Sequence, residues 1–344
     1  MKERYENLDG IRAFAAIGII LMHVKANGRF PISGFMYDSV ISSFTNLTFF
    51  FMLLSAFSMC CGYYEKFKSS TISLEKFYKR RFERVWPFFA FLCTLELAAE
   101  RSLTALFEWF ADLTLAFGLL PNANISVVGV GWFLGLIFVF YMVFPFYTFL
   151  LGNKKRGWFV LGITIVMNVL CRKYFLNETH VVDGFGARTN ILYSSMFFVA
   201  GGLIYLYREA IKKVVTRYKV FFIITTIVCI AFYYCVNGSE YTMVVLFTLI
   251  TALGISGGNI TKALFQNKGI RILSSVSMEI YLCHMFVFRI IEKLGFLHVT
   301  GIAVIDYAAV CAATIGGAAV VSLLFDKLLW LAENRLQKLK TEHG

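Results

Sequence analysis

The chain has 344 residues, of which 58% are hydrophobic and only 16% are charged, and its mean hydropathy is +0.70. Soluble domains carry about 25% charged residues, so this composition excludes an ordinary soluble protein and indicates a polytopic membrane protein. The formal net charge of +12 does not indicate a nucleic-acid partner, because the basic residues gather in short loops between apolar segments. The eight cysteines have no paired spacing, so neither a disulfide framework nor a metal site is predicted.

Apolar windows of about 20 residues predict an all-α transmembrane helical bundle of about ten spans plus short interfacial helices. The expected spans are residues 9–25, 42–62, 83–100, 130–151, 157–176, 189–207, 219–236, 240–257, 273–294 and 303–326. The short apolar segment 103–120 carries Glu108 and Asp112, so we expect an interfacial or re-entrant helix there. Residues 73–81 and the basic tail 327–344 are expected to form amphipathic helices at the membrane surface.

The charges of the loops predict the orientation of the chain. With the N-terminus in the cytoplasm, the inner loops are residues 63–82, 152–156, 208–218 and 258–272. These loops and the tail hold most of the lysines and arginines, whereas the outer side keeps only scattered basic residues, as the positive-inside rule requires. Both termini are therefore expected in the cytoplasm. The first apolar run lacks a signal-peptide cleavage site, and residues 1–344 are interpreted as one membrane domain.

The first predicted span carries two ionisable residues, Arg12 and His23, in an otherwise apolar sequence. Their spacing of eleven residues makes three helical turns plus about 20°, so both lie on one face, about 16 Å apart along the axis. Ionisable groups in this position are costly unless they face the interior of a bundle. Taken alone, Arg12 could also be a side chain that extends to the cytoplasmic interface. His23 could also be a buried residue that hydrogen-bonds another helix. A histidine is nevertheless well suited to accept a proton near neutral pH.

Two arginines at the start of the third predicted span are three residues apart, so Arg81 and Arg84 share a helix face near the cytoplasm. Two guanidinium groups there suit a phosphate or a carboxylate, although ordinary positive-inside charge explains them equally well. In the fourth span, Trp132 is followed by Tyr141, and Trp132 also fits an aromatic-belt residue at the outer interface.

The ninth predicted span places Glu279 and His284 at hydrocarbon depth. Both must face protein, water or each other, because an isolated ionisable group facing lipid is costly.

Taken in order, these segments resemble the membrane acyltransferase-3 family, whose members O-acylate cell-surface glycans and other acceptors. The opening Leu8-Asp9-Gly10-Ile11-Arg12 with His23 is similar to that family's LDG-x-R opening and later histidine. The other segments that carry the resemblance are Phe49–Phe57 (FFF-x-LSGF), Arg80–Pro87 (RR-x-x-R-x-x-P), Trp132–Pro145 (W-x-L…Y-x-x-x-P) and Ser277–His284 (S-x-x-x-YL-x-H).

The resemblance implies an acyl-CoA-dependent membrane O-acyltransferase with acetyl-CoA as the expected co-substrate and no permanently bound cofactor. It implies a glycan or lipid-linked sugar as acceptor and a bacterial cytoplasmic membrane as location. His23 corresponds to the family's catalytic histidine, and Arg12, Arg81 and Arg84 would serve the acyl donor. Supporting roles are assigned to Asp9, Ser55, Trp132, Tyr141, Glu279, Tyr281 and His284.

Two mechanisms remain open at this stage. In one, His23 deprotonates an acceptor hydroxyl, and in the other, Ser55 carries a covalent acyl group. Many family members have an acidic residue in the helix after the tryptophan, but Ile137 and Phe138 occupy that stretch here. A carboxylate that orients His23 would have to come from Glu279 or Glu96. The family's frequent glycines are replaced by alanine at positions 13 and 56.

The alternative hypothesis is a transporter or exporter of a small polar substrate or glycan. In that interpretation His23, Glu279 and His284 line a substrate path, and the arginines bind an anionic substrate or lipid. The sequence does not determine the oligomeric state.

Overall fold

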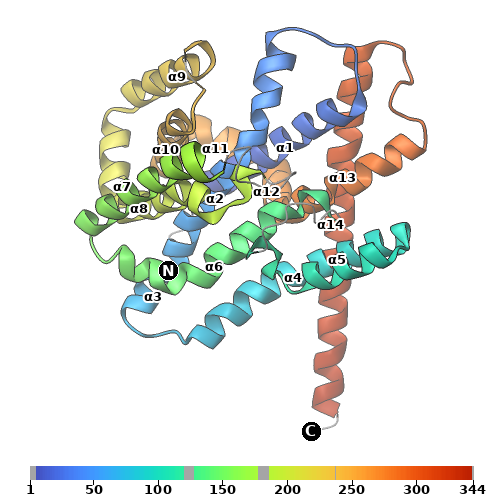
Figure 1. Cartoon of the computed structure of the whole chain (residues 1–344), viewed down its shortest axis with the longest axis horizontal. Coiled ribbons are helices and arrows are strands. Elements are labelled where there is room, and N and C mark those ends of the chain that lie inside the picture. The colour runs from blue at the N-terminus through green and yellow to red at the C-terminus, as the bar shows by residue number, and fades with distance from the viewer. Residues whose placement is uncertain (1–4, 120–127, 177–185, 237, 343–344) are drawn as a thin grey trace. The chain divides into compact units, whose positions relative to one another are not determined.

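The computed structural model describes residues 5–119, 128–176, 186–236 and 238–342 (Figure 1). Every regular element within these ranges is helical, so the all-α prediction is confirmed. The chain divides into two compact units, which we call unit 1 (Met1–Ala15 and Asn46–Arg271) and unit 2 (Ala16–Thr45 and Ile272–Gly344). Helix α1 (Glu6–Gly28) begins in unit 1 and ends in unit 2. The interpretation as one membrane domain stays a prediction.

Unit 1 contains most of the helices. They are α2 (Leu47–Met59), α3 (Glu65–Lys68), α4 (Leu74–Glu100), α5 (Leu103–Leu113), α6 (Trp132–Leu150), α7 (Lys154–Leu170), α8 (Ile191–Arg217), α9 (Lys219–Cys235), α10 (Glu240–Ser256) and α11 (Asn259–Phe265). Short 3-10 and π turns extend or join them: η3 (Cys60–Tyr64), η4 (Ala116–Leu119), η5 (Gly129–Gly131), η6 (Cys171–Phe175) and η7 (Ala187–Thr189). Two elements, η2 (Phe44–Asn46) and α12 (Lys268–Ser275), lie at the boundary between the units.

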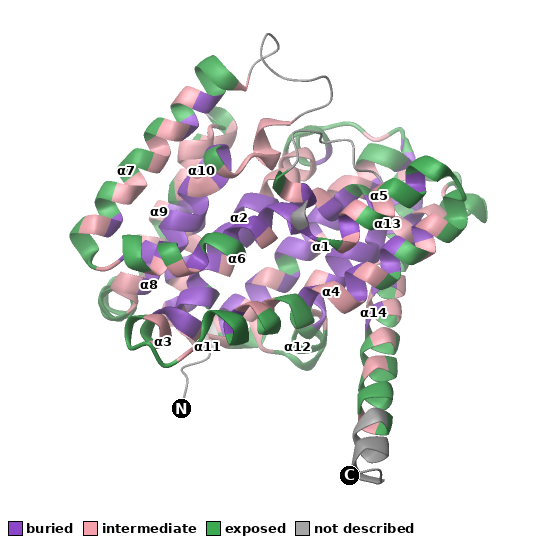
Figure 2. Cartoon of the chain, turned by 60° about the horizontal axis from the view of Figure 1, so that its bottom comes forward, coloured by how far each residue is buried: buried purple, intermediate pink, exposed green. Residues whose placement is uncertain are grey.

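The centre of unit 1 is α8, which packs against α2, α7 and α10. At Gly201, α8 approaches α2 so closely that a Cβ atom would collide with the carbonyl oxygen of Leu53. Ala56 is fully buried on the same face of α2, which shows that an alanine fits at this departure from the family pattern. Figure 2 shows buried residues concentrated along α2 and exposed residues along α7.

Six helical segments are long and apolar enough to cross a membrane, within the residues that the structure describes. They are Glu6–Gly28, Met36–Lys68, Gly129–Leu150, Lys154–Phe175, Ile191–Arg217 and Ala303–Arg335. A seventh would arise if α12 and α13 (Ser277–Lys293), which are bent by 79° around Val276, formed a single broken span. The multi-pass membrane character is confirmed, but the predicted count of ten is not.

The remaining predicted spans are helical, but they are too short or too charged to be among these candidate spans. Helices α9 and α10 have 17 residues each. A helix of that length rises about 25 Å, less than the ~30 Å hydrocarbon core. Helix α4 is one continuous helix that contains both the predicted surface segment 73–81 and the span 83–100, and its first half is highly charged. Ser73 caps its N-terminus by accepting a hydrogen bond from the backbone N–H of Lys76.

Large apolar side chains are exposed along α7 and α9. They include Trp158, Phe159, Ile163, Val166, Val220, Phe221, Ile224, Ile227 and Val228. Many exposed apolar side chains on one helix are costly in water and favourable in lipid. These two helices therefore have the surface expected of lipid-facing elements.

Unit 2 consists of the second part of α1, the π-helical turn η1 (Met36–Ile41), α13 and the long helix α14 (Ala303–Glu342). Helices α13 and α14 lie side by side (Figure 1), where the thiol of Cys283 is 3.6 Å from the carbonyl oxygen of Ala318. Tyr307 of α14 donates a hydrogen bond to the carbonyl oxygen of Leu21. This contact fastens α14 to α1. The predicted basic tail continues α14 to Glu342, and residues 343–344 lie outside the described residues.

The predicted interfacial segment forms α5 and then η4, and α5 is not among the candidate membrane-spanning helices. Its Asp112 is 2% exposed and accepts a long contact of 3.8 Å from the thiol of Cys93. The other carboxyl oxygen, Oδ1, is buried and has no hydrogen-bond partner within the described residues. Burial, aided by the nearby charge of Glu108, raises the pKa of Asp112 to about 7.

We expect the contact between α4 and α5 to lose stability as the pH rises from about 4 to about 7, because the folded state then binds a proton that the unfolded chain releases. Above pH ~7 the stability should be flat with respect to this group. Thermal unfolding followed by the fluorescence of Trp86, which donates a hydrogen bond to the carbonyl oxygen of Leu113, measures the effect.

The variant Asp112→Asn should unfold with no such pH dependence, whereas exposed Glu100→Gln should keep it. A wild-type profile that coincides with that of Asp112→Asn would contradict the shift.

Candidate functional site

Two predicted residues, Arg12 and Asp9, meet near the start of α1 in unit 1. Arg12 lies 3.6 Å from the carboxylate of Asp9, one turn earlier in the same helix. Its Nη2 donates a hydrogen bond of 2.9 Å to the hydroxyl of Ser58 on α2. The guanidinium is thus oriented by a carboxylate on one side and a hydroxyl on the other. The α2 hydroxyl that contacts Arg12 is that of Ser58, whereas Ser55 lies one turn earlier and is half-buried.

Arg81 of α4 is enclosed by two tyrosines. Its Nη2 donates a hydrogen bond of 3.0 Å to the hydroxyl of Tyr63, and its guanidinium carbon lies 5.0 Å from the Tyr63 ring centre and 5.9 Å from that of Tyr141. The Nε atom of Arg81 is buried and has no hydrogen-bond acceptor within the described residues. A buried guanidinium N–H without an acceptor is costly.

Arg84 and Tyr141 both lie within electrostatic range of Arg12. The structure therefore brings Arg12, Arg81, Arg84 and Tyr141 into one region of unit 1, which we call the arginine cluster. The positive charges of Arg12 and Arg84 repel each other there. The carboxylate of Asp9 compensates part of this positive charge.

In unit 2, His23 of α1 lies beside His284 of α13, with their ring centres 5.1 Å apart. His284 is fully buried, whereas His23 is half-buried. Far apart in the sequence, the two imidazoles form what we call the histidine pair.

The hydrogen bond of His284 assigns its tautomer. Its Nδ1 lies 2.6 Å from the carbonyl oxygen of Tyr281, and a carbonyl oxygen only accepts, so Nδ1 carries the hydrogen. Nε2 is buried and has no hydrogen-bond partner within the described residues. A second hydrogen there would be a buried donor without an acceptor, so His284 is neutral and presents a lone pair. The buried imidazole of His284 therefore adds no positive charge beside His23.

The other predicted supporting residues fall in both units. Glu279 and Tyr281 are buried on α13 in unit 2, and Tyr281 contributes the carbonyl that fixes His284. Glu96 is buried on α4 in unit 1. The two carboxylates considered as partners of His23 thus belong to different units, and only Glu279 belongs to the unit that holds His23.

Trp132 begins α6 and contacts a residue that the sequence did not single out. The guanidinium of Arg188 lies 5.2 Å from the Trp132 ring and 5.4 Å from the Phe49 ring. It also donates a hydrogen bond of 3.0 Å to the hydroxyl of Thr48. In the sequence, Arg188 is one of the scattered basic residues of the outer side. No local pattern around it predicts that it contacts the rings of Phe49 and Trp132.

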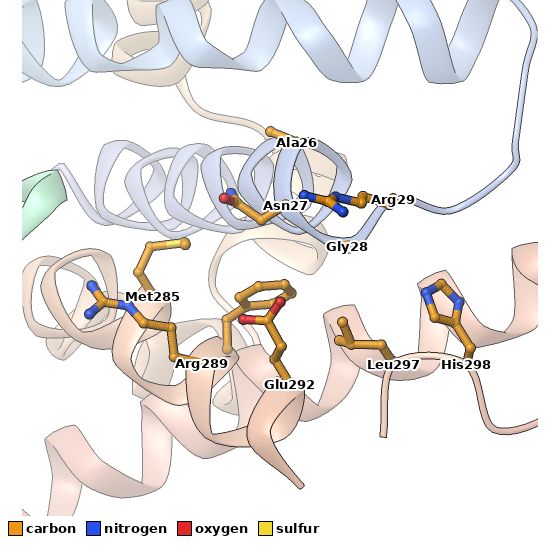
Figure 3. Close-up of a pocket in the computed structure, with 10 residues that line it drawn as sticks. Ala26, Asn27, Gly28, Arg29, Met285, Arg289, Glu292, Leu297 and His298 are labelled. Carbon is orange, nitrogen blue, oxygen red and sulfur yellow. The ribbon is translucent and has the colours of Figure 1, made fainter. Parts of the chain in front are cut away.

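One turn beyond the histidine pair, unit 2 contains a cavity of about 470 Å³, shown in Figure 3. It is lined by the ends of α1 and α13 and by the segment that follows α13. The lining residues are Ala26, Asn27, Gly28, Arg29, Met285, Phe288, Arg289, Glu292, Leu297 and His298. The volume lies within the ~300–1,000 Å³ of small-molecule sites.

No group of three or more His, Cys, Asp or Glu residues is arranged to hold a metal ion, in the part of the chain that the structure describes. The side chains at these sites present imidazoles, guanidinium groups, hydroxyls and carboxylates.

A family profile described as an acyltransferase domain, that of the acyltransferase-3 family, matches residues 5–323. The chain belongs to the acyltransferase-3 family. The match covers nearly the whole chain and includes the arginine cluster, the histidine pair and the cavity. Comparison with curated proteins and with solved structures finds no significant match.

Membership in the acyltransferase-3 family, together with the apolar helices, supports a membrane acyltransferase. Acyl transfer to a hydroxyl needs a base for the hydroxyl proton and positive groups or donors for a charged acyl carrier.

Proposed function

We propose that the protein is an O-acyltransferase that moves an acetyl group from cytoplasmic acetyl-CoA to a hydroxyl of a cell-surface polysaccharide or lipid-linked glycan. The observation that carries the proposal is the histidine pair within a chain that an acyltransferase profile matches almost throughout. The proposal places the chain in a bacterial cytoplasmic membrane with both termini in the cytoplasm, as the loop charges favour.

In this proposal the arginine cluster binds the donor. Acetyl-CoA carries a pyrophosphate and a 3′-phosphate, and guanidinium groups bind phosphates with charge-assisted hydrogen bonds. The acceptor-free Nε of Arg81 is a ready donor for one of these oxygens. With the N-terminus inside, Arg81 and Arg84 lie at the cytoplasmic end of α4, where acetyl-CoA is available.

His23 acts as the general base in this proposal. It takes the proton from an acceptor hydroxyl while the oxygen attacks the thioester carbonyl, and the carbon–sulfur bond then breaks to release CoA, whose thiolate takes up a proton. Neutral His284 lies beside His23 and adds no positive charge there. This route needs no acyl-enzyme, and Ser55 has no role in it.

Calorimetry with acetyl-CoA and the detergent-purified chain tests the proposal. We expect binding in the micromolar range, with desulfo-CoA and free phosphate as competitor controls that separate recognition of the carrier from nonspecific anion binding.

Absence of acetyl-CoA binding in a folded sample contradicts the proposal. Substrate flux into vesicles without acyl-CoA would then identify the transporter that the sequence left as the alternative.

A further inference from the structure

The cavity beyond the histidine pair is built from two helices that also carry the two imidazoles. On α1, Ala26 and Asn27 follow His23 by three and four residues, and on α13, Met285 follows His284 directly. Four residues are about one helical turn, or ~6 Å of rise. The amide of Asn27 also donates a hydrogen bond of 2.8 Å to the carbonyl oxygen of His23. The cavity therefore lies next to the histidine pair along both helices.

The chemistry of the lining favours a polar occupant. Asn27, Arg29, Arg289, Glu292 and His298 contribute an amide, two guanidinium groups, a carboxylate and an imidazole. An acyl chain would offer these groups no further hydrogen bonds. A ligand with several hydroxyl groups both donates and accepts, and so satisfies guanidinium and carboxylate together.

Two opposite charges face the cavity without pairing with each other. Figure 3 shows Asn27 and Arg29 on the α1 side and Glu292 on the α13 side. Within the described residues, neither the guanidinium of Arg29 nor the carboxylate of Glu292 has an ion-pair partner. A donor set and an acceptor set on opposite walls of one cavity leave room for a group that bridges them.

From these observations we infer that the cavity is the acceptor subsite and that it binds a sugar unit of the glycan. Arg29 donates hydrogen bonds to sugar oxygens, Glu292 accepts from sugar hydroxyls, and the hydroxyl to be acylated points along the helices toward His23. The inference rests on the proposed function, because it assigns the second substrate of the same reaction. With both termini inside, the ends of α1 and α13 lie on the outer side, where a surface glycan is found.

Saturation-transfer NMR on the detergent-purified full chain tests the inference. The probes are the methyl glycosides of glucose, galactose, N-acetylglucosamine and glucuronic acid. At least one is expected to bind the wild type, and Arg29→Gln and Glu292→Gln should each weaken that binding about tenfold, the effect of one lost charge-assisted hydrogen bond. Arg29→Lys should recover part of the loss, since it keeps the charge but not the planar fork.

The matched control is Arg101→Gln. Arg101 follows the end of α4 with the same left-handed backbone angle as Arg29, a φ of 51°, but it does not line the cavity. Sugar binding by this variant should equal that of the wild type. The inference is overturned if the wild type binds none of the sugars. It is also overturned if Arg29→Gln and Glu292→Gln bind sugar as the wild type does.

Acetyl-CoA calorimetry on the same samples keeps the two proposals apart. Donor binding that is equal in wild type, Arg29→Gln and Glu292→Gln, alongside lost sugar binding, supports the acceptor subsite. Absent donor binding in the wild type contradicts the proposed function, whatever the sugar probes show.

Discussion

Replacing His23 by alanine is expected to lower acetyl transfer by about 10²–10⁴-fold, the usual contribution of a general base. The acceptor hydroxyl then keeps its proton during attack on the thioester, while the arginine cluster still binds the donor. Alkali-labile acetate on the surface glycan of a deletion strain, complemented with each variant, measures transfer. Calorimetry with acetyl-CoA should show unchanged affinity, so the loss falls on turnover and not on donor binding.

The control for this experiment is His343→Ala, because residue 343 lies beyond the matched region 5–323. A second variant, His23→Gln, keeps a polar side chain of similar length and guards against loss of folding. Wild-type acetylation by a folded His23→Ala or His23→Gln protein would remove His23 from the mechanism.

The double variant Arg81→Ala/Arg84→Ala is expected to weaken acetyl-CoA binding by at least about 100-fold. Each lost hydrogen bond between charged groups costs ~1.5–3 kcal/mol, and each ~1.4 kcal/mol is tenfold in affinity. The affinity of the wild type should also fall as salt is added, because the contacts are with phosphates. Titration calorimetry at two salt concentrations measures both effects.

Arg80→Ala is the matched control for the double variant, since Arg80 is an exposed arginine on the same helix, next to Arg81. It should bind acetyl-CoA as the wild type does. If Arg80→Ala and the double variant lose affinity for acetyl-CoA equally, the loss comes from the reduced positive charge of the cytoplasmic side in general. The assignment of Arg81 and Arg84 to donor binding is then wrong.

The sequence predicted the helical class because hydropathy and its period are local properties. The same local rules set the helix limits less well. The predicted ninth span, 273–294, is broken at Val276, where no proline or glycine marks a bend of 79°. The predicted surface helix 73–81 leads into the predicted span 83–100 without a break, as one helix, α4, which Ser73 caps and in which Pro87 is accommodated.

By itself, the sequence determined that this chain is a helical membrane protein and that Arg12 and His23 share its first helix, since both follow from residue type and spacing along one helix. Only the tertiary structure decided which side chains meet. It placed His284 beside His23, brought Arg81 against Tyr63, and opened a cavity one turn beyond the histidines. Such contacts join helices that are distant in the chain. They depend on which faces pack together, and no local pattern encodes that choice.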